Sequence, residues 1–296
     1  MSKEKGFEVV TDTTSDIPED LAKEYEVNVI PYYIHMNDKE YKEGIDIEPE
    51  SIWDYLKNNL NHLPKTACPG VGEYYEAFKK IIEKGKNILS IHITSWGSGA
   101  YQSATTAKNI LASEYPEAKI EVFDSKSVSL GTGLLALEAA KASLKGWNLS
   151  ETIEHLKEIR KSFFHSFTND TLKYLAAGGR IGKAKLLLAE ALKINPIISI
   201  DEDGVLYALD KAMGRLKAYQ KIVEHMQNFF KEKNSLNIAL VYANALDELE
   251  NLKNEILKHF TVKDVIISKL GAALSVHSGP GTIGVLAYPS ELSLDK

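Results

Sequence analysis

The sequence has one cysteine and lacks the features that mark a secreted or membrane-spanning protein. Because Cys68 has no second cysteine to pair with, it supports neither a disulfide framework nor a cysteine-based metal site. The most apolar stretch, Leu130–Leu144, contains Glu138 and Lys141, so it predicts a buried helix and no membrane span. The first residues carry no apolar signal core, and we therefore expect a cytoplasmic protein.

Basic residues and nucleotide motifs are also scarce. Lysine and arginine number 35 against 41 aspartate and glutamate residues, for a formal net charge of −6. Nucleic-acid-binding domains usually carry a basic patch, so we expect no nucleic-acid partner. No histidine pair has zinc spacing, and no glycine-rich loop carries the lysine of a P-loop. We expect neither a metal nor a cofactor.

Strand and helix patterns alternate along the first half of the chain and change character after it. Alternation from Phe7 to Lys161 predicts a mostly parallel sheet with helices on both faces. After Ser162, a hairpin with its turn at 201–204 and a later strand–helix–strand order predict a smaller α/β unit with a mixed or antiparallel sheet. We predict an α/β fold of two domains, 1–161 and 162–296, with a ligand cleft between them.

One stretch combines a strand, a glycine-rich turn and a helix start. In residues 89–104, LSIHITSWGSGAYQSA, apolar and polar residues alternate as far as Ile93, and a helix is expected over 101–111. The free N–H groups at a helix N-terminus favour a negative charge. We expect Ser95 to hold an acidic head group here, with Thr94 in support.

The other candidate binding residues lie beside glycine or proline in expected loops. Arg180, within 178–182, can offer its planar fork to a carboxylate, although an arginine that neutralises a helix C-terminus is an alternative. His277 precedes a Gly-Pro-Gly loop, and a structural role is its alternative. Hydroxyl, guanidinium and imidazole groups together suit one small anion, and the set contains no acidic base, so it favours binding over turnover. The set is Thr66, Ser95, Arg180, Arg215 and His277, with Gly179 in support.

The motifs TDTTSDIP, KTACP, ITSWGSGAYQSA, LKYLAAGGRIGKAK and HSGPGTIGV, in this order, resemble the DegV family of fatty-acid-binding proteins. The resemblance runs from about Phe7 to Tyr288. It implies a two-domain α/β fold and a long-chain fatty acid, with its carboxylate held by Thr66, Ser95 and His277 and with Arg180 and Arg215 close by. It also implies a separate ATP-binding fatty acid kinase subunit as partner. The chain itself would be a carrier and no enzyme.

The resemblance also implies an apolar tunnel for the fatty-acid tail. Candidates for part of its wall are Leu186, Leu187, Leu188, Leu192 and Ile194, and a plain core helix over 185–193 explains them equally well. The chain departs from the family pattern at Ala67–Gly70, where the family usually has serine and proline. A second departure lies at 94–100, where Trp96 and Ala100 stand in place of residues of a Ser-Ser and Leu-Ser-Gly-Thr run. These departures bear on the preferred chain length.

Two enzymatic alternatives use the same residues. A phosphoryl-transfer enzyme would carry phosphate on His277, but the sequence lacks the magnesium-binding carboxylates and nucleotide loop of such enzymes. A hydrolase would use Ser95 and His277 as nucleophile and base, but neither an orienting acid nor a nucleophile elbow is visible.

Overall fold

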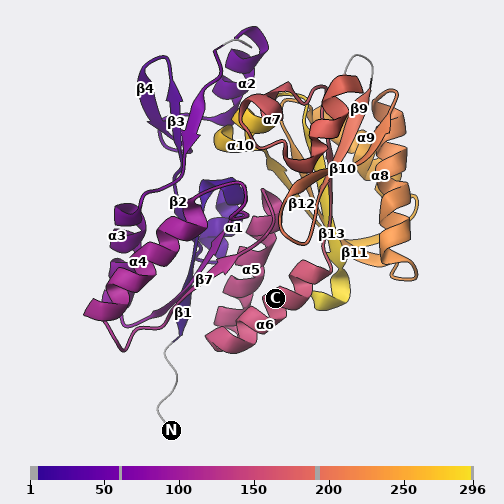
Figure 1. The fold of residues 1–296 in the computed structure, drawn as a ribbon. Helices are drawn as coiled ribbons and strands as arrows, with labels where there is room; N and C mark the ends of the chain where they lie inside the picture. Colours follow the sequence, from indigo (N-terminus) through magenta and orange to yellow (C-terminus); the bar gives the residue numbers. More distant parts are fainter. Residues whose placement is uncertain (1–5, 60–61, 191–193, 295–296) are drawn as a thin grey trace.

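The computed structural model describes residues 6–59, 62–190 and 194–294, and in these residues the strands form three sheets (Figure 1). The first is a parallel sheet in the order β2-β1-β6-β7, made of β1 (Phe7–Asp12), β2 (Asn28–Ile30), β6 (Asn87–His92) and β7 (Ile120–Asp124). A small antiparallel sheet joins β3 (Tyr33–Met36) to β4 (Lys39–Lys42) and β5 (Lys65–Ala67).

The third sheet is mixed and lies in the second half of the chain. Its order is β10-β9-β8-β13-β11-β12, and only the β11–β12 pair is parallel. Its strands are β8 (Phe164–Thr168), β9 (Asn195–Ile200), β10 (Leu206–Ala212), β11 (Ser235–Tyr242), β12 (Thr261–Lys269) and β13 (Ile283–Pro289). The predicted fold class, a parallel α/β sheet followed by a mixed one, is confirmed. The domain boundary at residue 161 stays a prediction.

Helices cover both faces of the parallel sheet because its strand residues alternate between two cores. Val10 and Ile88 pack with α3 (Val71–Glu83) and α4 (Ala100–Glu114). Their neighbours on the opposite face pack with α5 (Leu130–Leu144) and α6 (Leu149–Lys161). On the mixed sheet, α8 (Arg215–Phe230) and α9 (Leu246–Leu257) cover one face. The remaining described helices are α1 (Glu19–Glu24), α2 (Pro49–Asn58), α7 (Lys173–Ala177) and α10 (Ala272–Ser278), with short 3-10 turns η1 (Thr13–Ser15), η2 (Gly182–Glu190) and η3 (Ser290–Leu292).

Helix α5 lies between the two large sheets and packs in one core with strands of both (Figure 1). Its leucines and alanines pack against Leu89 and Ile91 of the parallel sheet and also against Ala239 and Leu286 of the mixed sheet. A helix that is apolar around its whole circumference is one that is buried on all sides. The prediction of a buried helix at this position is confirmed, and α5 joins the two halves of the molecule.

Several local predictions were wrong. The apolar and aromatic run 27–36 suits a single strand, but it breaks at Pro31 and Tyr32 into β2 and β3, which belong to different sheets. Proline has no N–H to donate to a sheet, which explains the break. Thr66 lies on β5 and His277 on α10, where loops were expected. The segment 185–193 was expected to be α-helical, but its described residues belong to η2, while 191–193 lie outside the described residues.

The unexpected helix α10 receives its N-terminal cap from distant parts of the chain. The N–H of Gly271 donates to the Asp16 carboxylate at 2.9 Å, and the N–H of Ala273 donates to the Glu43 carboxylate at 3.0 Å. Both carboxylates are buried, and burial raises the pKa of Asp16 well above its ordinary value and also raises the pKa of Glu43. Because the capping residues are more than 200 positions away in the sequence, no local pattern predicts the start of this helix.

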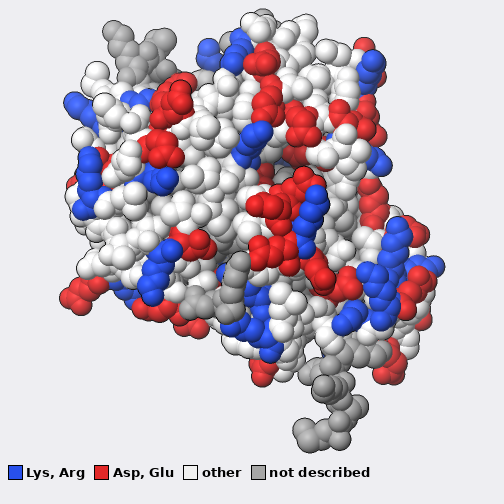
Figure 2. Space-filling view, turned by 180° about the vertical axis from the view of Figure 1, so that it is seen from behind, with Lys and Arg blue, Asp and Glu red and all other residues white. Residues whose placement is uncertain are grey.

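Within the described residues, no helix is both long and apolar enough to cross a membrane. Figure 2 shows the face opposite to that of Figure 1, where lysine and arginine side chains are scattered among aspartate and glutamate side chains. Acidic side chains gather near the middle of this face. This distribution agrees with the formal net charge of −6.

Candidate functional site: a cavity with one polar end

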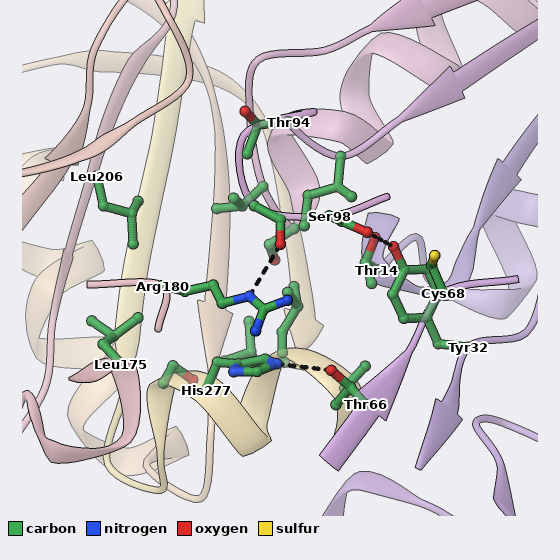
Figure 3. A pocket seen from close by; sticks show the side chains of 18 of the residues that line it. Thr14, Tyr32, Thr66, Cys68, Thr94, Ser98, Leu175, Arg180, Leu206 and His277 are labelled. Carbon is green, nitrogen blue, oxygen red and sulfur yellow. Dashed lines mark hydrogen bonds between the residues drawn. The ribbon is translucent and has the colours of Figure 1, made fainter. Parts of the chain in front are cut away.

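A cavity of about 350 Å³ lies where the two halves of the chain meet (Figure 3). Its polar side chains include two hydrogen-bonded pairs, Tyr32 with Ser98 and Thr66 with His277, and Arg180, which donates to the loop after β6. Its apolar side chains include Val128, Phe167, Leu175, Leu206 and Val241. The cavity therefore has one polar end and a long apolar wall.

The charges at this cavity are unequal. Among the described residues that line it, Arg180 is the one permanent cation, and none is an aspartate or glutamate. An ionised group inside a protein needs a partner of opposite charge or several hydrogen bonds. The cavity thus suits a ligand with a single anionic group and an apolar body.

His277 and Thr66 meet at the polar end. The Nε2 atom of His277, from α10, lies 2.8 Å from the Thr66 hydroxyl oxygen, on β5. The other ring nitrogen, Nδ1, is buried with no hydrogen-bond partner in the described structure. It packs on Gly178, where a Cβ atom would lie only 2.2 Å from Nδ1, so the site requires glycine there. Burial and, to a lesser extent, the Arg180 charge lower the pKa of His277 to about 4, so the ring is neutral at pH 7.

Arg180 extends over the polar end from the loop that follows α7 (Figure 3). Its Nε donates to the Gly97 carbonyl at 3.2 Å, and its Nη1 donates to the Gly178 carbonyl at 2.6 Å. The positive φ of Gly179, 71°, provides the turn that places the arginine there. The guanidinium ties the loop after β6 to the end of α7 while remaining in contact with solvent.

Ser98 is a lining residue that the sequence analysis missed. Its hydroxyl lies 2.7 Å from the Tyr32 hydroxyl and accepts a hydrogen bond from the N–H of Ala100 at the start of α4. Ser95, three residues earlier, was the expected head-group ligand, but it is exposed and does not line the cavity. The Ser95 hydroxyl donates to Asp124 at 2.6 Å instead. The right stretch was identified, but the serine next to the helix start is the one that faces the cavity.

Comparison with known proteins gives the family. The model of the DegV family, described as "uncharacterised protein, DegV family", matches residues 6–290. The chain belongs to the DegV family. It is 34% identical over 283 residues to a DegV domain-containing protein of Clostridium perfringens, and this match covers 96% of the chain and 98% of that relative.

Two solved structures extend the similarity to the whole fold of this DegV protein. A DegV family protein from Thermus thermophilus, described by its fatty acid binding, is 30% identical, with a TM-score of 0.89 and coverage of 98% of this chain and 100% of that one. DegV from Bacillus subtilis, described as a fatty acid binding protein, is 27% identical, with a TM-score of 0.84 and coverage of 97% and 100%. The fold is thus shared with relatives over nearly their full length.

Two further expected residues of this DegV protein are engaged elsewhere. Arg215 does not line the cavity, because it pairs with Asp170 at 2.8 Å and donates to the Gly281 carbonyl at 2.5 Å. Thr94 does line the cavity, but its hydroxyl donates to the Gly204 carbonyl at 3.0 Å. The cation available at the polar end is therefore Arg180.

The leucines expected in a tunnel wall do not line the main cavity. Leu186 is 77% exposed and Leu188 is 39% exposed, while Leu187 is buried in a small core with Leu172 and Leu175. Ile194 borders a separate small cavity, and Leu192 lies outside the described residues. The apolar wall comes instead from β8, β10, β11 and the segment before α5.

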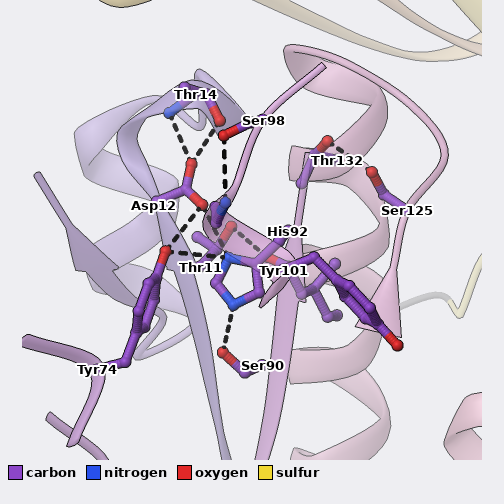
Figure 4. A network of polar contacts seen from close by, with 12 residues as sticks. Thr11, Asp12, Thr14, Tyr74, Ser90, His92, Ser98, Tyr101, Ser125 and Thr132 are labelled. Atoms are coloured by element: carbon purple, nitrogen blue, oxygen red, sulfur yellow. Dashed lines mark hydrogen bonds and ion pairs between the residues drawn. The ribbon is translucent and has the colours of Figure 1, made fainter. Parts of the chain in front are cut away.

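A second histidine cluster lies in the parallel sheet and was also missed (Figure 4). His92 Nδ1 lies 2.8 Å from the Asp12 carboxylate, and His92 Nε2 lies 2.7 Å from the Ser90 hydroxyl. All three side chains are fully buried. The Ser-His-Asp order resembles a hydrolase triad, but none of the three lines the main cavity, and Ser95 does not share that cavity with His277. Both observations count against a hydrolase.

Proposed function

We propose that this DegV protein binds one long-chain fatty acid, with the carboxylate at the Thr66–Arg180–His277 end of the cavity and the acyl chain along its apolar wall. The observation that carries the proposal is the composition of the cavity lining: one guanidinium, no carboxylate among the described residues, a set of hydroxyl and imidazole groups, and many apolar side chains. The fatty-acid-binding descriptions of its T. thermophilus and B. subtilis relatives support it.

The two ends of the ligand would contribute differently. Burial of an acyl chain is worth about 0.8 kcal/mol for each methylene, so the chain supplies most of the affinity. A hydrogen bond to a charged group is worth about 1.5–3 kcal/mol. The polar end therefore fixes the direction of the ligand, with the Arg180 guanidinium opposing the carboxylate charge and the Thr66 and Ser98 hydroxyls available as donors.

We further propose that the bound acid is presented to a separate ATP-binding kinase subunit. Arg180 is in contact with solvent, so a carboxylate beside it lies near the protein surface. In the partner's active site a carboxylate oxygen would bond to the γ-phosphorus of ATP as the bond to ADP breaks, which gives an acyl phosphate. The fatty-acid carboxylate is already ionised and needs no base, but the described cavity lining holds no acidic side chain that could bind the magnesium ion of ATP, so the phosphoryl transfer is assigned to the partner.

Native mass spectrometry of the purified protein tests fatty-acid binding. We expect a mass excess of one ligand for each chain, which solvent extraction identifies as a long-chain fatty acid. A protein that has no bound acid, and stays free of it when fatty acids are supplied, would overturn the proposal. Trapping with hydroxylamine then tests presentation: the loaded protein, ATP and a bacterial extract should yield the acyl hydroxamate, and its absence would contradict the kinase partnership.

A further inference from the structure

Two more hollows continue from the apolar end of the main cavity. A small cavity of about 50 Å³ at the start of α5 shares lining residues with the main cavity, namely Val128, Ser129, Phe167 and Val241. Beyond it lies a surface groove of about 940 Å³, which shares His165 and Ile200 with the small cavity. The three spaces therefore follow one another along a common wall.

The small cavity has the chemistry of a passage for methylene groups. It lies between the start of α5 and the face of the mixed sheet, and no lysine, arginine, aspartate or glutamate is among its described lining residues. Phe167, Ile200 and Val241 provide apolar side chains on the sheet side. His165 is its one titratable side chain, and burial lowers the pKa of this histidine to about 3, so the ring is neutral.

The β9–β10 turn lies between the main cavity, which Thr94 lines, and the groove, which Asp203 lines. The Thr94 hydroxyl donates to the Gly204 carbonyl at 3.0 Å, and Lys126 lies 3.8 Å from the Asp203 carboxylate. These contacts join the turn to the loops of the parallel-sheet half. We infer that a ligand reaching the groove passes on the inner side of this turn, through the small cavity between α5 and the mixed sheet.

The groove differs from the passage in its chemistry. It is open to solvent, and its described lining residues include four cations, Lys126, Arg160, Lys161 and Lys183, and the acidic turn at 201–203. Two of these cations are paired with that turn, because Lys183 lies 2.5 Å from Asp201 and Lys126 contacts Asp203. The aromatic rings of Phe163, Tyr207 and Phe229 also line it. A hydrocarbon end that emerges here would meet aromatic rings and would not be confined.

We propose that the acyl site is a channel open at both ends, in which the methyl end of a long chain passes between α5 and the mixed sheet and emerges in the groove. This inference rests on the proposed fatty-acid binding and extends it to the class of acid. A closed pocket rejects chains longer than itself, whereas an open channel sets no sharp upper limit of length. The ligand class therefore includes saturated acids longer than those that fill the main cavity.

A chain-length series with the full-length protein tests the channel. Dissociation constants are measured for saturated acids from dodecanoic to docosanoic acid, delivered from cyclodextrin and read by native mass spectrometry. The key variant is Ile200→Trp, because Ile200 borders both the small cavity and the groove. The matched control is Tyr207→Trp, since Tyr207 lines the groove and not the small cavity.

We expect the unmodified protein and Tyr207→Trp to bind docosanoic acid at least as tightly as hexadecanoic acid. Ile200→Trp should keep its affinity for dodecanoic acid and lose about fourfold for every methylene that the tryptophan excludes. If Ile200→Trp does not fold by circular dichroism, Val241→Phe narrows the other end of the passage and should show the same selective loss.

Two results would overturn the channel while leaving fatty-acid binding intact. One is rejection of docosanoic acid by the unmodified protein, which would show a closed pocket. The other is an unchanged length profile in folded Ile200→Trp and Val241→Phe. Failure of acids of every length to bind the unmodified protein would instead overturn the proposed function, and the channel with it.

Discussion

His92 and His277 belong to two clusters of similar polar groups, which differ in how many of the histidine ring nitrogens have a hydrogen-bond partner. His92 has a hydrogen-bond partner at each ring nitrogen, Ser90 and Asp12, and the cluster is sealed in the parallel sheet. His277 has a partner at Nε2 alone, while its Nδ1 is buried without one in the described structure. Buried polar groups in native proteins are nearly always paired. The complete cluster is therefore structural, and the incomplete one retains hydrogen-bonding capacity beside a cavity.

The largest expected effect is on stability, at the complete cluster. His92→Leu leaves the Asp12 carboxylate buried without its histidine partner. Removal of one member of a buried pair costs about 3–5 kcal/mol. Urea denaturation should show a loss of this size in the free energy of unfolding. Asp54→Ala, at an exposed carboxylate paired with Lys57, is the control and should change it by less than about 1 kcal/mol. Equal losses in the two variants would contradict the distinction.

The second effect concerns the pH dependence of stability. The pKa of His277 is about 4 in the folded chain against an ordinary 6.5, so the unfolded chain takes up this proton first as the pH falls. The contribution of the neutral His277 ring to the free energy of unfolding is fully present above pH 6.5. About 3 kcal/mol of it is lost as the pH falls from about 6.5 to 4. His277→Leu should flatten the stability curve of the lipid-free protein in this window. The raised pKa of Asp16 acts in the opposite direction in both proteins, so the two curves are compared at each pH. Parallel curves would refute the expectation.

A third prediction separates binding from stability at the incomplete cluster. His277→Leu removes a group from the polar end of the cavity together with its unpaired nitrogen. We expect fatty-acid affinity to fall by about tenfold or more. A tenfold loss corresponds to the weakest hydrogen bonds made to charged groups. The free energy of unfolding at pH 7 should change by less than about 1 kcal/mol. A loss as large as that of His92→Leu would make the two clusters equivalent.

The smallest effect distinguishes two serines of one loop. Ser98→Ala removes a hydroxyl that faces the cavity, and we expect fatty-acid affinity to fall by about fivefold, as for one ordinary hydrogen bond. Ser95→Ala removes an exposed hydroxyl bound to Asp124 and should leave affinity unchanged. Isothermal titration of both variants with the same acid provides the comparison. The reverse result would restore Ser95 as the head-group ligand.

The features that could be predicted from the sequence are those set by local patterns. The apolar circumference of α5 indicated a fully buried helix, and the hairpin at 195–212 was visible in its acidic turn. The polar end was identified in part, since Thr66, Arg180 and His277 line one cavity. Their functional roles stay predictions.

The features that could not be predicted depend on contacts between distant residues. Helix α10 is short, and its cap comes from Asp16 and Glu43, so the sequence around His277 resembles a loop. The pairing of Asp12 with His92 joins two strands that are 80 residues apart. Arg215 has the right chemistry to bind an anion, but it forms a salt bridge with Asp170. The two residues are 45 positions apart, so the sequence alone does not identify them as partners.

The strand order of the mixed sheet determines when, during synthesis, the main cavity can form. Among the described strands, β8 and β11 do not pair with each other, and β13 lies between them and joins both halves of the sheet. On the ribosome the nascent chain therefore carries two unjoined half-sheets, whose free edges are open to mispairing, until residues 283–289 emerge. The cavity also requires α10, which is synthesised shortly before β13. The proposed fatty-acid ligand could therefore be captured only after translation has passed this last strand.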